Sequence, residues 1–511
     1  MSSILPASAL TGESLDLVRR ALAAGGSLAK AGWIAPTSAT SGINYYDLEV
    51  PVKQLFPIDT PLRDRIPRAK APGGTQANWR AITGINSGHQ SPGVSEGNRN
   101  AVVNHTTADY FAAFRELGEE DNLTWKAEYT AEGFADLKAL VVDNLLRATM
   151  VSEELIDLGG NTSLALGTTP TPTLAASTTG GTLGSHTYSV ICVALTNDGY
   201  IQLAGINMGT TGEAFSAATA ALTAVFNRTT ANGASDSYGG GVAQKSANAT
   251  VAVTGATGSM TATVTPVVGA VAYAWYWGQS AGSEVLGAVT TINSILITAD
   301  STGTQNATAL PSSDNSENGY VYDGIITQLS KGLGSYYKAL ATGTAGTGTP
   351  LTSDGAGGIV ELNAMFRSMY DLYRLSPDTL YVSSQEMTNI NAKIIAGGGA
   401  PLFRYNLDVT GQNDIIGGVV IAGLINKITG KKVMLRVHPN MPPGTIVAYS
   451  DLIPYPLSGV RQVLRKLLRY DYRALEWPMV TRRYEWGVYF DGVLQNYFPP
   501  AFGLITNIGN G

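Results

Sequence analysis

The stretch GAVAYAWYWG at positions 269–278 carries two tyrosines and two tryptophans. Its large side chains alternate along the chain, at Val271, Tyr273, Trp275 and Trp277, and such a period of two is typical of a strand with one buried face. Because aromatic side chains bury large apolar areas, the stretch predicts a β-type core beneath that face. A ligand-binding aromatic platform is the alternative use of these side chains.

The segment around this strand differs in composition from its flanks. Between Gly160 and Pro311 the charged residues are few, namely Asp198, Glu213, Arg228, Asp236, Lys245, Glu284 and Asp300. A second alternating run contains Tyr188, Val190, Cys192 and Ala194 and precedes Asn-Asp-Gly at 197–199, which predicts a strand followed by a turn. We therefore expect an independent all-β sandwich, with Cys192 as an inert buried thiol.

Length and charge limit the possible classes of protein. A chain of 511 residues predicts more than one domain. Its net charge of −6 gives no general attraction to nucleic acid or to anionic membranes, and a single cysteine excludes an intramolecular disulfide framework. The N-terminal sequence lacks the pattern of a signal peptide, and the most apolar run, 415–426, is too short to cross a bilayer. We expect a soluble protein without membrane contact.

Two patterns precede the β segment. The runs 76–85 and 101–114 read as strands joined by a long polar tip, and such an extended hairpin needs a partner surface, for which another copy of the chain is a candidate. Residues 123–158 show apolar side chains at three- and four-residue steps, which predicts a long helix. A short amphipathic helix is expected at 13–22.

The region after the β segment is mixed. Helices are expected at 361–375 and 384–395, and strands at 379–383, 417–426, 431–438 and 444–450, which together predict a compact α+β domain. The remaining sequence alternates again and predicts a final antiparallel sheet.

Signatures of chemistry are lacking in the sequence. The histidines, His89, His105, His186 and His438, have no metal-ligand spacing and are expected on the surface or in strands. GLINKITGKK at 423–432 has the wrong glycine spacing for a phosphate loop and reads as a hairpin turn, and the glycine runs at 239 and 397 read as loops. We therefore predict no catalytic, cofactor-binding or metal-binding residue, no cofactor and no enzyme activity.

The C-terminal region contains a local basic cluster, made of Arg461, Arg465, Lys466, Arg469, Arg473, Arg482 and Arg483. Phosphate contact is one use of such a cluster. The favoured use is ion pairing across subunits with Glu119, Glu120, Asp121, Glu153 and Glu154 of neighbouring copies.

The order of these parts resembles the Hong Kong 97-like major capsid proteins of tailed phages. SPGVSEGNRN resembles the tip of their extended loop, ADLKALVVDNLLRATMVSEELIDLG their spine helix, and YDGIITQLSKG the entry to their axial domain. RYDYRALEWPMVTRRYEWGVYFDGVLQNYFPPAFGLI resembles the returning peripheral strands. TLGSHTYSVICVALTNDG together with GAVAYAWYWGQSAGSEVLG resembles immunoglobulin-like or fibronectin type III-like domains of bacteria and phages.

The resemblance implies an α+β capsid fold with an inserted immunoglobulin-like sandwich. Its parts would be an N-terminal arm at 1–60, an extended loop at 61–118, the spine helix of the peripheral domain at 119–160, the insert at 161–312, a peripheral continuation at 313–335, the axial domain at 336–455 and peripheral strands at 456–511. The insert would be tethered by threonine-, proline- and glycine-rich ends and displayed on the outer surface.

The implied function is self-assembly, as hexamers and pentamers, into the icosahedral head of a virion. Partners would include packaged double-stranded DNA in non-specific contact and scaffolding, portal and decoration proteins, with assembly in the host cytoplasm. Some members cross-link neighbouring subunits through a lysine of the extended loop, but this chain has no lysine between Lys70 and Lys126. We therefore expect a shell without such cross-links, and a separate scaffolding protein or none.

Three alternatives stay open. The first is a carbohydrate-binding or adhesive surface protein that uses exposed aromatic residues of the sandwich. The second is a non-viral compartment shell of the same fold that encloses enzymes. The third is a hydrolase whose catalytic residues are dispersed beyond any motif.

Overall fold

The computed structural model describes residues 58–511 except 86–87, 132–135, 205–214, 397–420 and 456–457. The chain divides into two units, and the second, residues 56–127 with 138–511, contains nearly all of the described residues. The predicted helix at 13–22 and nearly all of the predicted arm lie outside the described residues. Among the described residues, no helix combines the length and apolarity that spanning a membrane requires.

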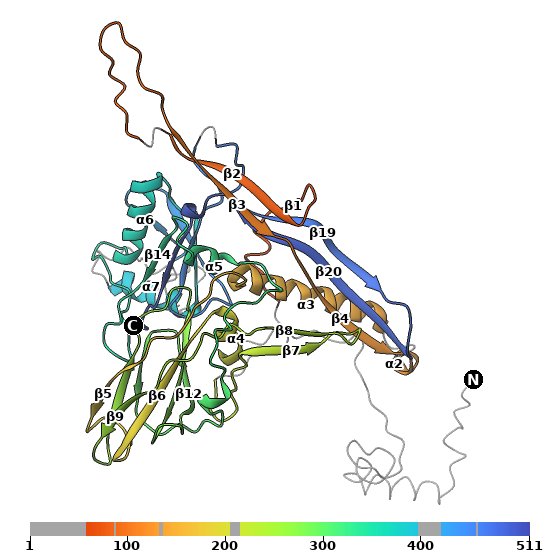
Figure 1. The fold of residues 1–511 in the computed structure, drawn as a ribbon, viewed down its shortest axis with the longest axis vertical. Helices are drawn as coiled ribbons and strands as arrows, with labels where there is room; N and C mark the ends of the chain where they lie inside the picture. Colours follow the sequence, from red (N-terminus) through yellow and green to blue (C-terminus); the bar gives the residue numbers. More distant parts are fainter. Residues whose placement is uncertain (1–57, 86–87, 132–135, 205–214, 397–420, 456–457) are drawn as a thin grey trace, which may run out of the picture. The chain divides into compact units, whose positions relative to one another are not determined.

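A four-stranded sheet, in the order β1-β19-β20-β4, is built from both ends of the second unit (Figure 1). Its strands are β1 (Arg68–Lys70), β4 (Arg115–Thr124), β19 (Leu464–Glu476) and β20 (Arg483–Asn496). The antiparallel pairing of β19 with β20 confirms the predicted tail. The prediction missed β4, because its charged sequence lacks apolar alternation and it becomes a strand by pairing with the edge of β20.

The helix expected at 123–158 begins two residues later than predicted, and the structure assigns two helices to this range. Leu123 and Thr124 belong to β4, and the helical residues form α2 (Trp125–Ala131) and α3 (Leu137–Gly159). Near its C-terminal end, α3 is buried at Glu153–Leu155 and from Asp157 onward. This places acidic side chains in the interior.

The predicted hairpin is confirmed. β2 (Gln76–Ile85) pairs with β3 (His105–Ala113) in a separate two-stranded sheet. The described part of its connecting segment continues away from both strands as a long tip (Figure 1).

The low-charge segment forms the expected β sandwich. One sheet has the order β13-β10-β5 and the other β12-β11-β6-β9. The strands are β5 (Thr173–Ser177), β6 (His186–Leu195), β9 (Ala249–Val253), β10 (Ser259–Thr263), β11 (Ala272–Gly278), β12 (Val285–Thr290) and β13 (Ser294–Ile297). Between the sheets lie the alternating side chains of β6 and β11, including Tyr188, Cys192, Tyr273, Trp275 and Trp277.

Two details of the predicted sandwich are wrong. Residues 197–199 begin a helix, α4 (Asn197–Ala204), instead of a hairpin turn. Strand β11 is buried on both faces, because Ala272, Ala274 and Tyr276 pack on the side opposite the sandwich core in a cluster that also contains Tyr200 and Leu203 of α4. Val271 belongs to this second cluster as well.

A mixed sheet holds the remaining strands, in the order β14-β21-β18-β15-β17-β16. They are β14 (Tyr336–Ala339), β15 (Thr379–Val382), β16 (Gly423–Ile425), β17 (Lys432–Val437), β18 (Ile446–Tyr449) and β21 (Gly503–Thr506). The neighbouring helices are α5 (Ile325–Ser330), α6 (Val360–Tyr373) and α7 (Ser384–Ala396). The predicted helices and strands of this α+β region are confirmed within the described residues, and residues 426–431 form the expected turn between β16 and β17.

The remaining elements are short. β7 (Val225–Thr229) and β8 (Ser235–Gly239) form a hairpin of their own, and 3-10 helices occur at Ala307–Ala309 and Pro499–Ala501.

Candidate functional site

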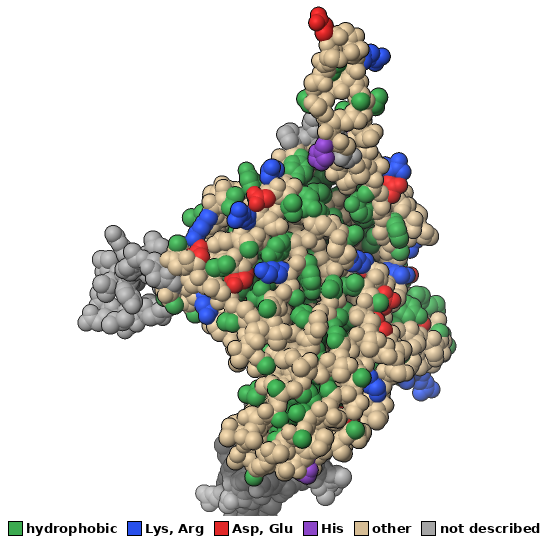
Figure 2. Space-filling model, turned by 60° about the vertical axis from the view of Figure 1, so that its left-hand side comes forward, with side chains coloured by type: hydrophobic (Ala, Val, Ile, Leu, Met, Phe, Trp, Pro, Cys, Tyr) green, Lys and Arg blue, Asp and Glu red, His purple; other side chains and the backbone are tan. Residues whose placement is uncertain are grey.

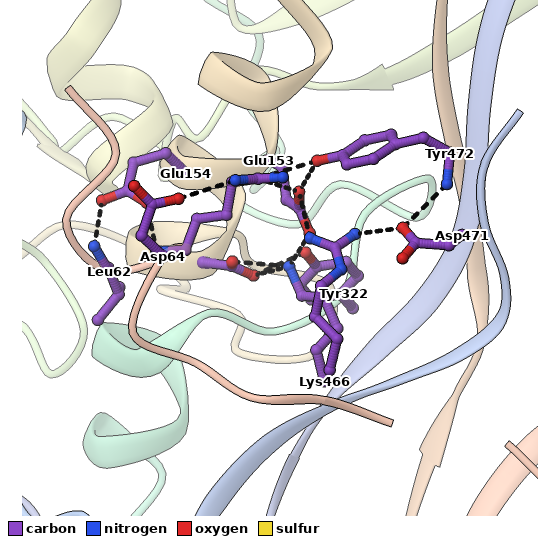
Figure 3. Close-up of polar contacts among 11 residues, drawn as sticks. Leu62, Asp64, Glu153, Glu154, Tyr322, Lys466, Asp471 and Tyr472 are labelled. Atoms are coloured by element: carbon purple, nitrogen blue, oxygen red, sulfur yellow. Dashed lines mark hydrogen bonds and ion pairs between the residues drawn. The ribbon is translucent and has the colours of Figure 1, made fainter. Parts of the chain in front are cut away.

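A buried charge network lies where the end of α3 meets the segment around Thr60–Arg68 and strand β19 (Figure 3). Helix α3 contributes Glu153, Glu154 and Asp157, each 0% exposed. A buried carboxylate without a partner costs several kcal/mol, so every one of them needs compensation. The compensating groups come from distant parts of the sequence.

Glu153 is surrounded by positive charge. Its carboxylate accepts from Arg63 Nε at 2.9 Å, from Arg68 Nη1 at 3.1 Å and from Lys466 Nζ at 2.5 Å. The hydroxyl of Tyr472 also donates to it. Burial alone would raise the pKa of Glu153, but Lys466 and Arg68 outweigh burial and hold this pKa at about 2. Glu153 is therefore a carboxylate at neutral pH.

Glu154 binds the backbone of the preceding segment. Its two oxygens accept from the amide N–H of Leu62 at 3.0 Å and of Arg63 at 2.6 Å. His438 Nε2 lies 2.6 Å from the same carboxylate. Since these backbone donors are fixed by geometry, Glu154 determines the path of the chain where the described residues begin.

Asp157 lies opposite Lys466. Both of its carboxylate oxygens lie 2.6 Å from Nζ, and the hydroxyl of Tyr322 donates to it at 2.7 Å. Burial raises the pKa of Asp157 to about 6, against the opposing effect of Lys466. The Lys466 ammonium also lies 5.2 Å from the ring centroid of Tyr322 and 5.7 Å from that of Phe490.

Further ion pairs extend the anchoring of this segment. Arg65 pairs with Asp451 at 2.6 Å and lies over the ring of Tyr449 at 4.5 Å, and Arg68 pairs with Asp471 at 2.9 Å. The network therefore joins the start of the described chain to α3, to β19 and to Asp451, two residues after β18.

The predicted pairing of the basic cluster with neighbouring copies is wrong for Lys466, Glu153 and Glu154, which are paired within the chain. Arg469 likewise pairs with Asp491 of the adjacent strand β20. The sequence did contain a signal of buried acidic residues, namely the Glu-Glu-x-x-Asp pattern among apolar residues of a helix. Glu153 and Asp157 are four residues apart in this pattern, so their carboxylates lie on one face of the helix. The sequence does not reveal which cations meet them.

The histidines follow the prediction except for one. His89, His105 and His186 are exposed, whereas His438 is buried at 1% exposure beside Glu154. Among the described residues, no group of three or more His, Cys, Asp or Glu side chains is arranged to hold a metal ion.

A second candidate site is the surface of the β2–β3 hairpin. One face packs, with Trp79 stacked on Tyr110 at 5.8 Å between ring centroids. The opposite face is open and carries Phe111 at 74% and Ile82 at 68% exposure. Every residue from Ser91 to Thr107 is exposed.

Side chains of the tip vary in character. Figure 2 shows hydrophobic side chains along the tip, with acidic and basic groups at its end. We call the open face of the hairpin together with residues 91–104 the hairpin surface.

Comparisons with known proteins give low similarity. No family model and no curated protein matches the chain. The capsid of a native GTA particle is similar at 9% identity and a TM-score of 0.39, over 91% of this chain and 96% of that chain. The capsid of cyanophage P-SCSP1u is similar at 8% identity and a TM-score of 0.38, over 94% and 98%. Scores this low do not assign a fold.

Proposed function

We propose that this chain is a structural shell protein, the major capsid protein of a tailed double-stranded DNA phage with a Hong Kong 97-like fold. The observation that carries the proposal is the hairpin surface. A two-stranded hairpin is only marginally stable in water by itself, and this one leaves Phe111 and Ile82 largely exposed. Burying such a side chain stabilises a contact by about 1.5–3 kcal/mol, so a second copy of the chain is a suitable partner.

The order of elements supports the same proposal. A hairpin with a long tip is followed by a 23-residue helix, and a four-stranded sheet is closed by strands from near the C-terminus. We assign the hairpin to the extended loop, α3 to the spine helix, the six-stranded sheet to the axial domain and the sandwich to an immunoglobulin-like insert on the outer surface. When many weak contacts act together in a closed shell, the overall binding affinity far exceeds that of any single contact.

The chemistry of the described residues supports a role without catalysis. The buried charged groups are occupied in holding chain segments together, and the four aromatic residues of β11 are no more than 7% exposed, which leaves no aromatic platform there. A carbohydrate-binding role for this strand is therefore disfavoured. In the proposed role, the partners are further copies of the chain, packaged DNA and scaffolding, portal and decoration proteins, and the location is the virion.

Sedimentation of the purified chain, followed by negative-stain electron microscopy of the fast fraction, tests the proposal. We expect rings or closed shells, with a scaffolding protein supplied where assembly requires one. A chain that stays monomeric under both conditions would overturn the proposal.

A matched pair of variants assigns assembly to the hairpin surface. Phe111→Asp places a charge on the open face and is expected to abolish fast-sedimenting particles without lowering Tm. Val268→Asp, at a residue of the sandwich that is 51% exposed, is expected to assemble normally. Equal assembly of the two variants would contradict the role of the hairpin.

A further inference from the structure

The Lys466 amine contacts both oxygens of the Asp157 carboxyl. Both carboxyl oxygens lie 2.6 Å from Nζ, so the nitrogen faces the carboxyl carbon between them. Distances this short place the nitrogen within about 3 Å of the carboxyl carbon, so the two atoms that an amide bond would join are already in contact. The pair is therefore close enough for bond formation, and attack requires the carboxyl group to turn its π face toward the amine.

The surroundings of the pair exclude water. Lys466 is 1% exposed, and Asp157 and Glu153 are 0% exposed. The rings of Tyr322 and Phe490 lie beside the amine. Burial disfavours the charged form of a carboxyl group and therefore favours the neutral acid at Asp157. The raised pKa of Asp157, which follows from burial, has the direction that such a reaction needs.

A proton carrier is also in place. Glu153 Oε1 lies 2.5 Å from Lys466 Nζ, on the same amine that faces Asp157. The guanidinium groups of Arg63 and Arg68 and the Tyr472 hydroxyl hold Glu153 in its orientation. A carboxylate in this position can take a proton from the ammonium and return it to the leaving oxygen.

We propose that Lys466 and Asp157 condense into an intramolecular amide bond, with Glu153 as the proton carrier. Glu153 accepts a proton from the ammonium, and the free amine attacks the carboxyl carbon of Asp157. The new C–N bond forms, one C–O bond breaks, and the oxygen leaves as water with the protons. Ammonium and carboxylate thus give amide and water, with no oxidant, reductant or co-reactant.

The bond would close a very long loop. Its two ends are 309 residues apart in sequence, and the loop contains the sandwich and five of the six strands of the six-stranded sheet. Cross-linking distant residues restricts the unfolded chain and stabilises the fold most when the loop is long. The chain contains a single cysteine, so a disulfide within the chain does not supply such a staple. The bond lies within one chain, so it is expected both before and after any assembly.

Intact-mass measurement of the full-length, denatured chain is the direct test. We expect a mass below that of the sequence by one water, about 18 Da, because amide formation releases one water. A tryptic digest should contain a branched peptide that joins the Lys466 and Asp157 regions. On a boiled, reduced gel the looped chain should migrate ahead of an unlinked chain. A full sequence mass after prolonged incubation of the folded protein overturns the proposal.

Two variants separate this bond from other losses of water, such as succinimide formation at an Asp-Gly step. Lys466→Arg keeps the positive charge but lacks the amine, so it should have its full mass. A water loss that persists in Lys466→Arg overturns the proposal. Glu153→Gln should slow or abolish the loss, and an unchanged rate would refute the role of Glu153. If either variant fails to fold, the mass of the natural chain and its branched peptide still decide the matter.

Discussion

Removal of the Glu154 carboxylate should release the segment around Thr60–Arg68. In Glu154→Ala the amide groups of Leu62 and Arg63 and the ring of His438 all lose the acceptor that they share. A buried donor left without a partner costs about 1–3 kcal/mol. Breaking a buried charged contact costs about 3–5 kcal/mol in total, and we expect local destabilisation of this size.

Limited trypsin digestion of the folded chain measures this release. Arg63 and Arg65 lie within the anchored segment, so cleavage there requires local opening. A cost of about 3 kcal/mol corresponds to roughly a hundredfold faster cleavage, since each 1.4 kcal/mol is tenfold. Hydrogen exchange of the Leu62 and Arg63 amides should accelerate to the same degree.

Asp64→Ala is the matched control. Asp64 lies in the same segment and pairs with Arg63, but its side chain is 63% exposed. An exposed pair contributes little, so we expect a change within about 0.5 kcal/mol. Equal cleavage rates in Glu154→Ala and Asp64→Ala would refute the anchoring role of Glu154.

Three further outcomes follow from the structure. Burial raises the pKa of Glu386. The folded protein therefore loses stability as pH rises through this raised pKa, because the buried carboxyl must then ionise. Glu386→Gln should raise Tm at pH 7 and have little effect at acid pH. An added Cβ at Gly287 would lie 2.1 Å from the indole of Trp277, so Gly287→Ala should destabilise the sandwich by about 1–3 kcal/mol in urea unfolding, whereas Gly319→Ala, with nothing within 4 Å, should be neutral. Assembled particles should show no ladder of linked subunits on a denaturing gel; such a ladder would refute the expectation drawn from the lysine-free extended loop.

Local patterns were readable from the sequence because neighbouring residues determine them. The hairpin strand at 76–85 and the core face of β11 follow from alternation over a few residues, and both agree with the structure. Strand β4 was missed because its partner β20 lies more than 350 residues away, and no local pattern reveals that pairing. The predicted half-burial of β11 failed for a similar reason, since only the fold places α4 over its second face.

The partners in the charge network were also not predictable from local sequence patterns. Glu153 and Glu154 look like solvated residues of a helix, because the sequence separates them from their cations by 90 residues for Arg63 and 313 for Lys466. Only the folded chain brings these residues together. The pattern of acids on α3 was visible, whereas their burial was not.

The sandwich is joined to the rest of its unit by more than its two ends. Asn293, the residue before β13, is 0% exposed and forms two hydrogen bonds with Asn507, which follows β21. The backbone amide of Asn293 donates to Asn507 Oδ1 at 2.8 Å, and Asn507 Nδ2 donates to Asn293 Oδ1 at 3.0 Å. Asn507 adopts a positive φ of 61°, which asparagine tolerates better than most residues. Loss of this contact would leave the backbone amide of Asn293 without the acceptor that Asn507 provides, and a buried donor normally has a partner. The sandwich is therefore attached by these contacts as well as by its two chain ends.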